Sequence, residues 1–171
     1  MNPPMAFVAL GSNLGDSAAT VRQAMLQLQQ LSPAPLLKSS LWGSTPVDCP
    51  PGSPLFVNAA VGLQPHPGET PESLLARLQA MEQLFGRRTK RLLNEPRPLD
   101  LDLVAFGSEV RDSPVLILPH PCAHLRAFVL EPLAEIAPDL VLPRHTQTVR
   151  ALLTGLRTDE ILQRLDESTL R

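Results

Sequence analysis

Two aspartates separated by one residue are the clearest chemical feature of this sequence. Asp100 and Asp102 lie in a stretch, residues 99–103, that alternates leucine with aspartate. Because side chains alternate between the two faces of a strand, this spacing predicts both carboxylates on one face and the leucines on the other. Two hard oxygen ligands on a rigid strand suit Mg²⁺, above all Mg²⁺ shared with substrate phosphates. A solvated sheet face carrying two acids without a function explains a lone pair equally well.

A basic segment precedes the aspartates. Its charged members are Arg87, Arg88, Lys90, Arg91 and Arg97, in a chain whose formal net charge is −2. Cations beside a metal site are typical of enzymes that transfer phosphoryl groups, because stabilising negative charge accounts for most of that catalysis. Runs of charge usually lie on solvated loops, but the closeness of this run to the aspartates favours the catalytic interpretation.

Two further segments contain candidate ligand-binding groups. Residues 10–16, with the sequence LGSNLGD, join an expected strand to an expected helix, where backbone N–H groups can hold a phosphate. A tight turn with a helix cap explains this segment better on its own. His120 stands between Pro119 and Pro121, so either a phosphate contact or simple rigidity accounts for it. The sequence contains no Ser-His-Asp or Cys-His pattern that would indicate nucleophilic catalysis.

The composition narrows the class of protein. With 171 residues, 43% of them hydrophobic, the chain fits a single domain over residues 1–171 with a well-filled core. A near-neutral charge and only one Trp, five Phe and no Tyr argue against a nucleic-acid partner. Cys49 and Cys122 lack the spacing of a zinc site. Without a signal peptide or a membrane-spanning run, we expect a cytoplasmic monomer with no membrane partner.

Hydrophobic periodicity and turn residues predict the elements that must position these groups. The expected strands are residues 6–10, 36–44, 56–63 and 99–106, and the expected helices are residues 17–31, 71–85 and 123–136, with one or two short helices within 149–165. This order predicts an α+β protein with a ferredoxin-like βαββαβ core, an antiparallel sheet with helices on one face, and additional C-terminal helices. Such a fold hosts many functions and does not identify one.

Several short motifs occur along the chain in unbroken order. They are LGSNLG at 10–15, STP at 44–46, FVNAA at 56–60, Glu82 before Gly86-Arg87, PRPLDLD at 96–102, PHP at 119–121, RAFVL at 126–130 and PLAEIAP at 132–138. Each motif alone is weak, whereas together in this order they are highly specific. Over residues 6–138 the sequence resembles the 6-hydroxymethyl-7,8-dihydropterin pyrophosphokinase family.

The resemblance implies an activity and a catalytic centre. Enzymes of this family transfer the terminal diphosphate of ATP to the hydroxymethyl oxygen of the dihydropterin and release AMP, in folate biosynthesis. Asp100 and Asp102 match the aspartates that bind two Mg²⁺ ions on the triphosphate. Arg87 and Arg97 match arginines that contact the phosphates, and the resemblance therefore implies that these four residues form the catalytic group.

The resemblance also implies two substrate sites. The ATP site would include Arg87, Arg97, His120, Gln79 and Glu82. In the pterin site, an amide would bind the edge of the ring, two phenylalanines would enclose its faces, and a loop would supply backbone contacts. The residues implied for the pterin are Asn58, Phe56, Phe128, Thr45, Pro46, Val47 and Asp100.

The sequence departs from well-known relatives beside the ATP site. Asn94 and Glu95 stand where those relatives carry a tryptophan and a glycine, and Thr89 replaces an arginine. Pro121 replaces a tyrosine after the histidine. These changes affect the loop that closes over ATP, residues 88–95, and leave the aspartates intact.

Three alternatives make different predictions. A nucleotidyltransferase also combines a Gly-Ser turn with paired aspartates, but there the two lie close in sequence, unlike residues 11–12 and the aspartates here. An RNA-recognition module shares the strand order but needs exposed aromatic residues on its central strands, and Phe7 and Phe106 lie in apolar runs. A degenerate, inactive relative would not be expected to retain both aspartates and Arg97.

Overall fold

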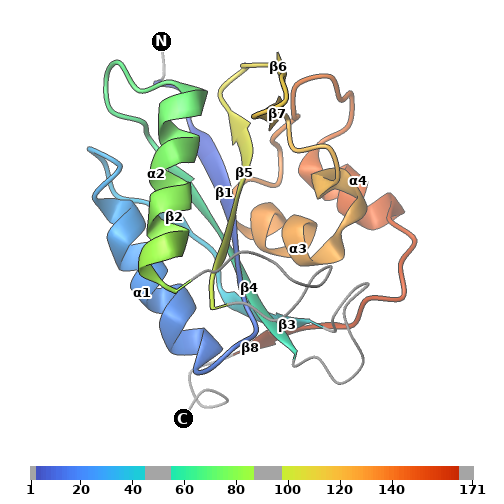
Figure 1. The fold of residues 1–171 in the computed structure, drawn as a ribbon. Coiled ribbons are helices and arrows are strands. Elements are labelled where there is room, and N and C mark those ends of the chain that lie inside the picture. Colours follow the sequence, from blue (N-terminus) through green and yellow to red (C-terminus); the bar gives the residue numbers. More distant parts are fainter. Residues whose placement is uncertain (1–2, 45–54, 87–97, 166–171) are drawn as a thin grey trace.

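The computed structural model describes residues 3–44, 55–86 and 98–165. Its main element is a six-stranded antiparallel sheet with the order β5-β1-β4-β3-β8, in which β2 also pairs with β4 (Figure 1). A separate short hairpin joins β6 to β7. The strands are β1 Ala6–Ser12, β2 Leu37–Lys38, β3 Leu41–Ser44, β4 Phe56–Leu63, β5 Asp100–Phe106, β6 Arg111–Asp112, β7 Ile117–Leu118 and β8 Leu162–Leu165.

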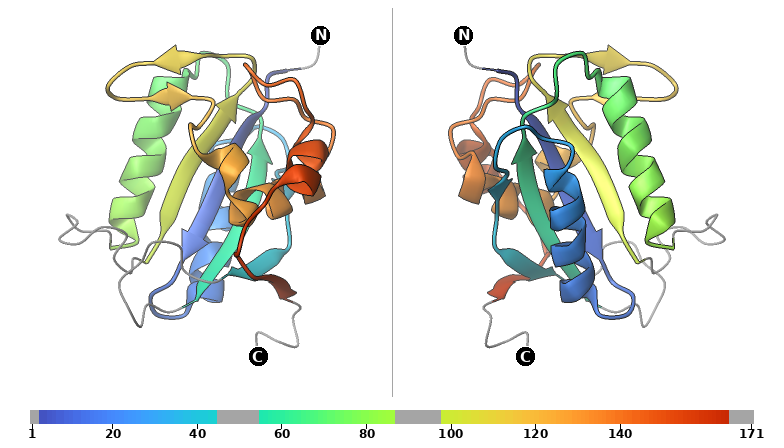
Figure 2. Two further views of the ribbon diagram at one scale, coloured as in Figure 1. Left: turned by 90° about the vertical axis from the view of Figure 1, so that its right-hand side faces the viewer. Right: turned by 90° about the vertical axis from the view of Figure 1, so that its left-hand side faces the viewer.

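Two helices cover one face of the sheet (Figure 2). Helix α1, Ser17–Gln29, begins after Asp16, whose side chain accepts a hydrogen bond from the Ala19 N–H at 3.2 Å. Helix α2, Pro71–Leu84, begins after Thr70 with a capping box and ends before Gly86, which adopts a positive φ of 95°. Both starts and both ends agree with the prediction to within two residues. The apolar side of each helix packs against the sheet around Ala6, Val8, Leu10, Leu101 and Leu103.

The C-terminal helices cover the opposite face. Helix α3, Ala127–Ile136, and helix α4, Val149–Gly155, form a second core with Phe7, Ala9 and Ala60. Helices on one face only were therefore the wrong expectation for the whole molecule. The reason lies in β1, which is buried at every position from Ala6 to Ser12, so that both faces of the sheet need cover.

Two predicted helical segments differ in detail. Residues 123–136 form a short 3₁₀ helix, η1 Ala123–Leu125, followed by α3, because Arg126 adopts an extended conformation between them. Residues 162–165, expected within a short helix, instead form strand β8, which pairs with β3 at the edge of the sheet. Residues 36–44 divide into β2 and β3 at Ser39, whose hydroxyl accepts a hydrogen bond from the Ala60 N–H at 2.8 Å.

The core topology is β1-α1-β3-β4-α2-β5, with β5 and β4 on either side of β1. This is the ferredoxin-like arrangement that the order of elements predicts. In the described parts of the chain, none of the helices combines the length and the apolar character needed to cross a bilayer.

Candidate active site

One row of residues crosses the sheet on the face that α3 covers. Asp100 on β5 pairs with Gly11 on β1, and Gly11 pairs with Asn58 on β4. Directly opposed residues in antiparallel strands point to the same face, so the carboxylate and the amide lie on either side of the glycine. Since neighbouring strands are about 4.8 Å apart, the backbones of Asp100 and Asn58 are separated by roughly 10 Å.

Asp100 and Asp102 project together from β5, as their spacing predicts. Both are partly exposed, whereas Leu99, Leu101 and Leu103 are at most 4% exposed and pack under α1 and α2. Both aspartates interact with other groups in the structure. Among the described residues no group of three potential metal ligands occurs. A pair of carboxylates is nevertheless the usual protein contribution to Mg²⁺ that also binds phosphates, so the residues present fit such an ion.

Gly11 leaves the space between the two polar groups open. A Cβ atom at this position would lie 3.4 Å from Asn58 Oδ1 and 3.7 Å from Phe56 Cδ1. Phe56, two residues before Asn58 on β4, points to the same face and is partly exposed. A flat ligand lying across Gly11 would therefore meet an aromatic ring and an amide.

The amide of Asn58 is fixed in orientation. Asn58 is 2% exposed, and its Nδ2 donates a hydrogen bond to Ser44 Oγ at 2.6 Å. Because Nδ2 is committed to Ser44, Oδ1 lies on the side of Gly11. In the sequence, Ser44 stands out only as the first residue of the STP motif at 44–46. Its contact with Asn58 depends on the register of β3 against β4, which pairs Ser44 with Phe56.

His120 lies close to the aspartates. Its backbone N–H donates to the Val104 carbonyl on β5 at 2.9 Å, and its Nδ1 accepts from the Cys122 N–H at 3.1 Å. The ring proton is therefore on Nε2, which remains a donor in the neutral form. Burial lowers the pKa of His120, and the positive charge of Arg126 lowers it further, while Asp100 opposes the change.

The lowered pKa of His120 predicts how stability depends on pH. Between the ordinary histidine value near 6.5 and the lower native value, the unfolded chain binds a proton that the folded chain does not. The free energy of unfolding should therefore fall as pH falls through this window. An NMR titration should place the His120 midpoint below 6.5, and a midpoint above it would contradict the assignment. His120→Asn should reduce the pH dependence of unfolding in urea.

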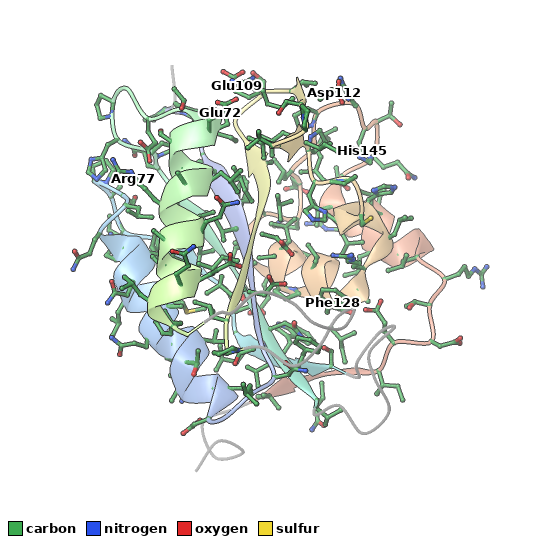
Figure 3. All side chains as sticks on the ribbon, viewed as in Figure 1. Glu72, Arg77, Glu109, Asp112, Phe128 and His145 are labelled. Carbon is green, nitrogen blue, oxygen red and sulfur yellow. The ribbon has the colours of Figure 1, made fainter. Side chains whose placement is uncertain are left out.

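Phe128 reaches the same face of the sheet from α3 (Figure 3). It is partly buried against the second core. The guanidinium carbon of Arg126 lies 5.6 Å from the centre of its ring. In the sequence, Arg126 opens the RAFVL motif, and nothing in that motif predicts a role for it. The structure identifies it as a cation near both Phe128 and His120.

Gln79 and Glu82 belong to α2, which covers the other face of the sheet. Gln79 is exposed, whereas Glu82 is 7% exposed and its Oε2 accepts a hydrogen bond from the Leu101 N–H at 2.8 Å. Among the described strands β5 lies at the edge of the sheet, so none of them pairs with the Leu101 N–H on that side. Glu82 therefore supports the backbone between the two aspartates. Its contact with ATP, like that of Gln79, stays a prediction.

Glu82→Ala should destabilise the protein. The change removes the acceptor of the buried Leu101 N–H, a loss that typically costs about 1–3 kcal/mol. Urea unfolding should show the decrease, and Glu82→Gln, which keeps an acceptor oxygen, should recover most of it. Equal stability of the alanine variant and the wild type would contradict the supporting role.

Five of the implied site residues lie outside the described residues. They are Arg87, Arg97, Thr45, Pro46 and Val47. In the sequence, residue 45 follows Ser44, which ends β3, and residue 97 stands three positions before Asp100, which begins β5. Their roles stay predictions.

Known proteins resemble this chain over most of its length. The family model described as 7,8-dihydro-6-hydroxymethylpterin-pyrophosphokinase matches residues 7–138. A 2-amino-4-hydroxy-6-hydroxymethyldihydropteridine pyrophosphokinase of Pseudomonas aeruginosa is 42% identical over 142 residues, which cover 81% of this chain and 85% of the relative. An enzyme of the same name from Haemophilus influenzae is 40% identical over 149 residues, covering 86% of this chain and 90% of the relative.

Solved structures support the fold. An HPPK-DHPS in complex with substrates superposes with a TM-score of 0.69 at 12% sequence identity, over 91% of this chain and 43% of that one. Wild-type HPPK-DHPS of Plasmodium falciparum superposes with a TM-score of 0.67 at 13% sequence identity, over 90% of this chain and 44% of that one. This chain thus spans less than half the length of these two solved chains. The family match, the two relatives and the shared fold lead to one conclusion: the chain belongs to the 7,8-dihydro-6-hydroxymethylpterin-pyrophosphokinase family.

Proposed function

We propose that this chain transfers the terminal diphosphate of ATP to the hydroxymethyl group of 6-hydroxymethyl-7,8-dihydropterin and releases AMP, a step of folate biosynthesis. Its family and its relatives, which are named for this reaction, support the proposal. The observation that carries it in the structure is the row Asp100–Gly11–Asn58. The row carries a carboxylate suited to a metal–phosphate complex and an amide suited to a heterocycle on strands whose backbones are roughly 10 Å apart.

The pterin would lie across Gly11. Asn58 would bind the polar edge of the ring through its fixed amide, and the missing side chain at Gly11 would let the ring approach the sheet. Phe56 and Phe128 would provide apolar contact on its two faces, as flat ligands require. Residues 45–47 would add backbone contacts. In this orientation the hydroxymethyl group would point toward β5 and its aspartates.

The ATP phosphates would bind at the Asp100 end of the row. Asp100 and Asp102 would hold two Mg²⁺ ions on the triphosphate, and these ions, when bound, supply the neutralisation of charge that diphosphate transfer requires. The Nε2–H of His120 would donate to a phosphate oxygen. Arg87 and Arg97 would stabilise the negative charge as it shifts to the departing AMP.

The proposed reaction needs no protein nucleophile. The hydroxymethyl oxygen attacks the phosphate next to AMP directly, with the attacking and leaving oxygens roughly in line. The protein then acts by holding two substrates in the right orientation, which removes much of the entropic cost of their encounter. One rigid sheet supplies residues for both substrates, so their relative position is fixed by strand register.

The RNA-recognition alternative requires exposed aromatic rings on the central strands. Phe7 on the central strand β1 is 6% exposed and Phe106, on the edge strand β5, is 5% exposed, so neither is available for base stacking. Phe56 on the central strand β4 is partly exposed, but a single ring does not form the platform that such modules use to stack two or three bases. A nucleotidyltransferase would release pyrophosphate, whereas the proposed reaction releases AMP.

One assay tests the proposed function. Purified protein, ATP, Mg²⁺ and 6-hydroxymethyl-7,8-dihydropterin should yield AMP and the diphosphorylated pterin in equal amounts, resolved by chromatography. Omission of the pterin should abolish AMP release. Pyrophosphate release instead of AMP, or no turnover by a well-folded sample, would refute the proposal.

A further inference from the structure

We propose that Glu160 is a positioning residue for the pterin pocket, acting through the N-terminal turn of α3. This inference rests on the proposed function, and it concerns a part of the chain, residues 156–165, that follows the family match ending at residue 138. The segment contacts two walls of the proposed pocket. One wall is the first turn of α3, with Phe128, and the other is β3, with Ser44.

Glu160 caps α3 from a distant part of the sequence. Its Oε2 accepts a hydrogen bond from the N–H of Ala127, the first residue of the helix, at 2.8 Å. Arg126, at the N-cap position, makes no capping hydrogen bond with its own side chain. A carboxylate at this end also interacts favourably with the helix dipole. Glu160 therefore does for α3 what Asp16 and Thr70 do for α1 and α2.

A local turn orients the carboxylate. The Thr158 hydroxyl donates to Glu160 Oε2 at 3.0 Å, and the Glu160 N–H donates to Thr158 Oγ1 at 3.1 Å. Both bonds connect residues two apart, so they fix the Glu160 side chain relative to its own backbone. The same oxygen that caps the helix is thus held from the other side by Thr158.

The residues after Glu160 contact the second wall. Leu162 on β8 pairs with Ser44 on β3, whose hydroxyl accepts from the amide of Asn58. Figure 2 shows the segment after α4 extending to β8, which lies beside β3. A single short segment therefore connects the strand that orients Asn58 to the helix turn that carries Phe128.

The other end of α3 is held independently. Glu135 accepts from the indole Nε1 of Trp42 at 2.7 Å and from the hydroxyl of Ser40 at 2.8 Å. With this end of the helix bound to the sheet, loss of the Glu160 cap would free only the first turn. We therefore expect a local change at Phe128 rather than loss of the fold.

The test compares substrate constants in four variants. Glu160→Ala should raise KM for the pterin about fivefold, the size expected for loss of one helix cap, with a much smaller change in KM for ATP. Thr158→Val should produce a smaller increase, and Glu160→Gln, which keeps an acceptor for the Ala127 N–H, should restore most of the affinity. Asp159→Asn, a change at an exposed neighbour, should match the wild type.

Hydrogen exchange provides a readout that does not depend on activity. The amides at the start of α3 should exchange faster in Glu160→Ala than in the wild type, while those of α1 and α2 should not. Unchanged exchange in α3, or equal increases in both KM values, would overturn the inference. Absence of turnover in the wild type would refute the proposed function instead, and the exchange result would still decide whether Glu160 holds the helix.

Discussion

Replacement of either Asp100 or Asp102 by alanine should lower kcat by about 1,000-fold or more and leave the fold intact. Loss of one carboxylate removes a metal ligand, so the negative charge of the phosphates in the transition state is less well neutralised. Removing a group that stabilises such charge commonly lowers the rate by a factor of this size or larger. The fold should persist because both side chains are partly exposed. The core packing of β5 depends on Leu99, Leu101 and Leu103.

The measurement is a steady-state assay of AMP release together with a thermal melt for each variant. A suitable control is Asp139→Ala, which removes an aspartate side chain that is 83% exposed and paired with Arg150 at 3.3 Å. The control should retain wild-type kcat, because exposed ion pairs contribute little. Near-wild-type turnover by either catalytic-site variant would show that the metal assignment is wrong.

Gly11→Val should abolish measurable pterin binding, with at least a 100-fold rise in Kd. The added side chain would occupy the space between Asn58 and Phe56, where its Cβ alone would lie 3.4 Å from Oδ1 and 3.7 Å from Cδ1. The effect should be steric rather than conformational, since Gly11 lacks a positive φ and valine is well suited to a strand. Loss of the apolar contact and of the amide hydrogen bond together readily accounts for about 3 kcal/mol, or more than 100-fold.

Calorimetric titration with the pterin, in the presence of a non-hydrolysable ATP analogue, provides the measurement. Gly11→Ala should give an intermediate Kd. Gly43→Ala is the matched control, because Gly43 lies in the same sheet on β3, which β4 separates from β1, and its added Cβ would contact Leu165 at 3.5 Å, away from Asn58. ATP binding should change little in all three variants. If Gly11→Val bound the pterin with the wild-type Kd, the pterin ring would not lie across Gly11.

Local patterns were sufficient to predict several features of the fold. The spacing of Asp100 and Asp102 predicts their shared face because strand periodicity is a property of the backbone. Asp16 and Thr70 mark the starts of α1 and α2 because capping depends on neighbouring residues. The order of strands and helices was likewise enough to predict the ferredoxin-like core, which the structure confirms.

Features that depend on contacts between distant segments were not predictable in the same way. The position of Gly11 between Asp100 and Asn58 follows from strand register, which one residue of slippage would change completely. The strand character of residues 162–165 arises from pairing with β3 rather than from a hydrophobic pattern. The bond from Glu160 to Ala127 spans 33 residues and has no local signal. The buried role of Glu82 depends on β5 lying at a sheet edge.

A crystal structure of the protein with an ATP analogue, Mg²⁺ and the dihydropterin would test the central claim most directly. We expect both Asp100 and Asp102 to bind magnesium on the triphosphate, and the pterin ring to lie across Gly11 with its edge on Asn58 and its hydroxymethyl group toward β5. A pterin bound away from the Asp100–Gly11–Asn58 row, or magnesium bound without either aspartate, would contradict the proposed mechanism.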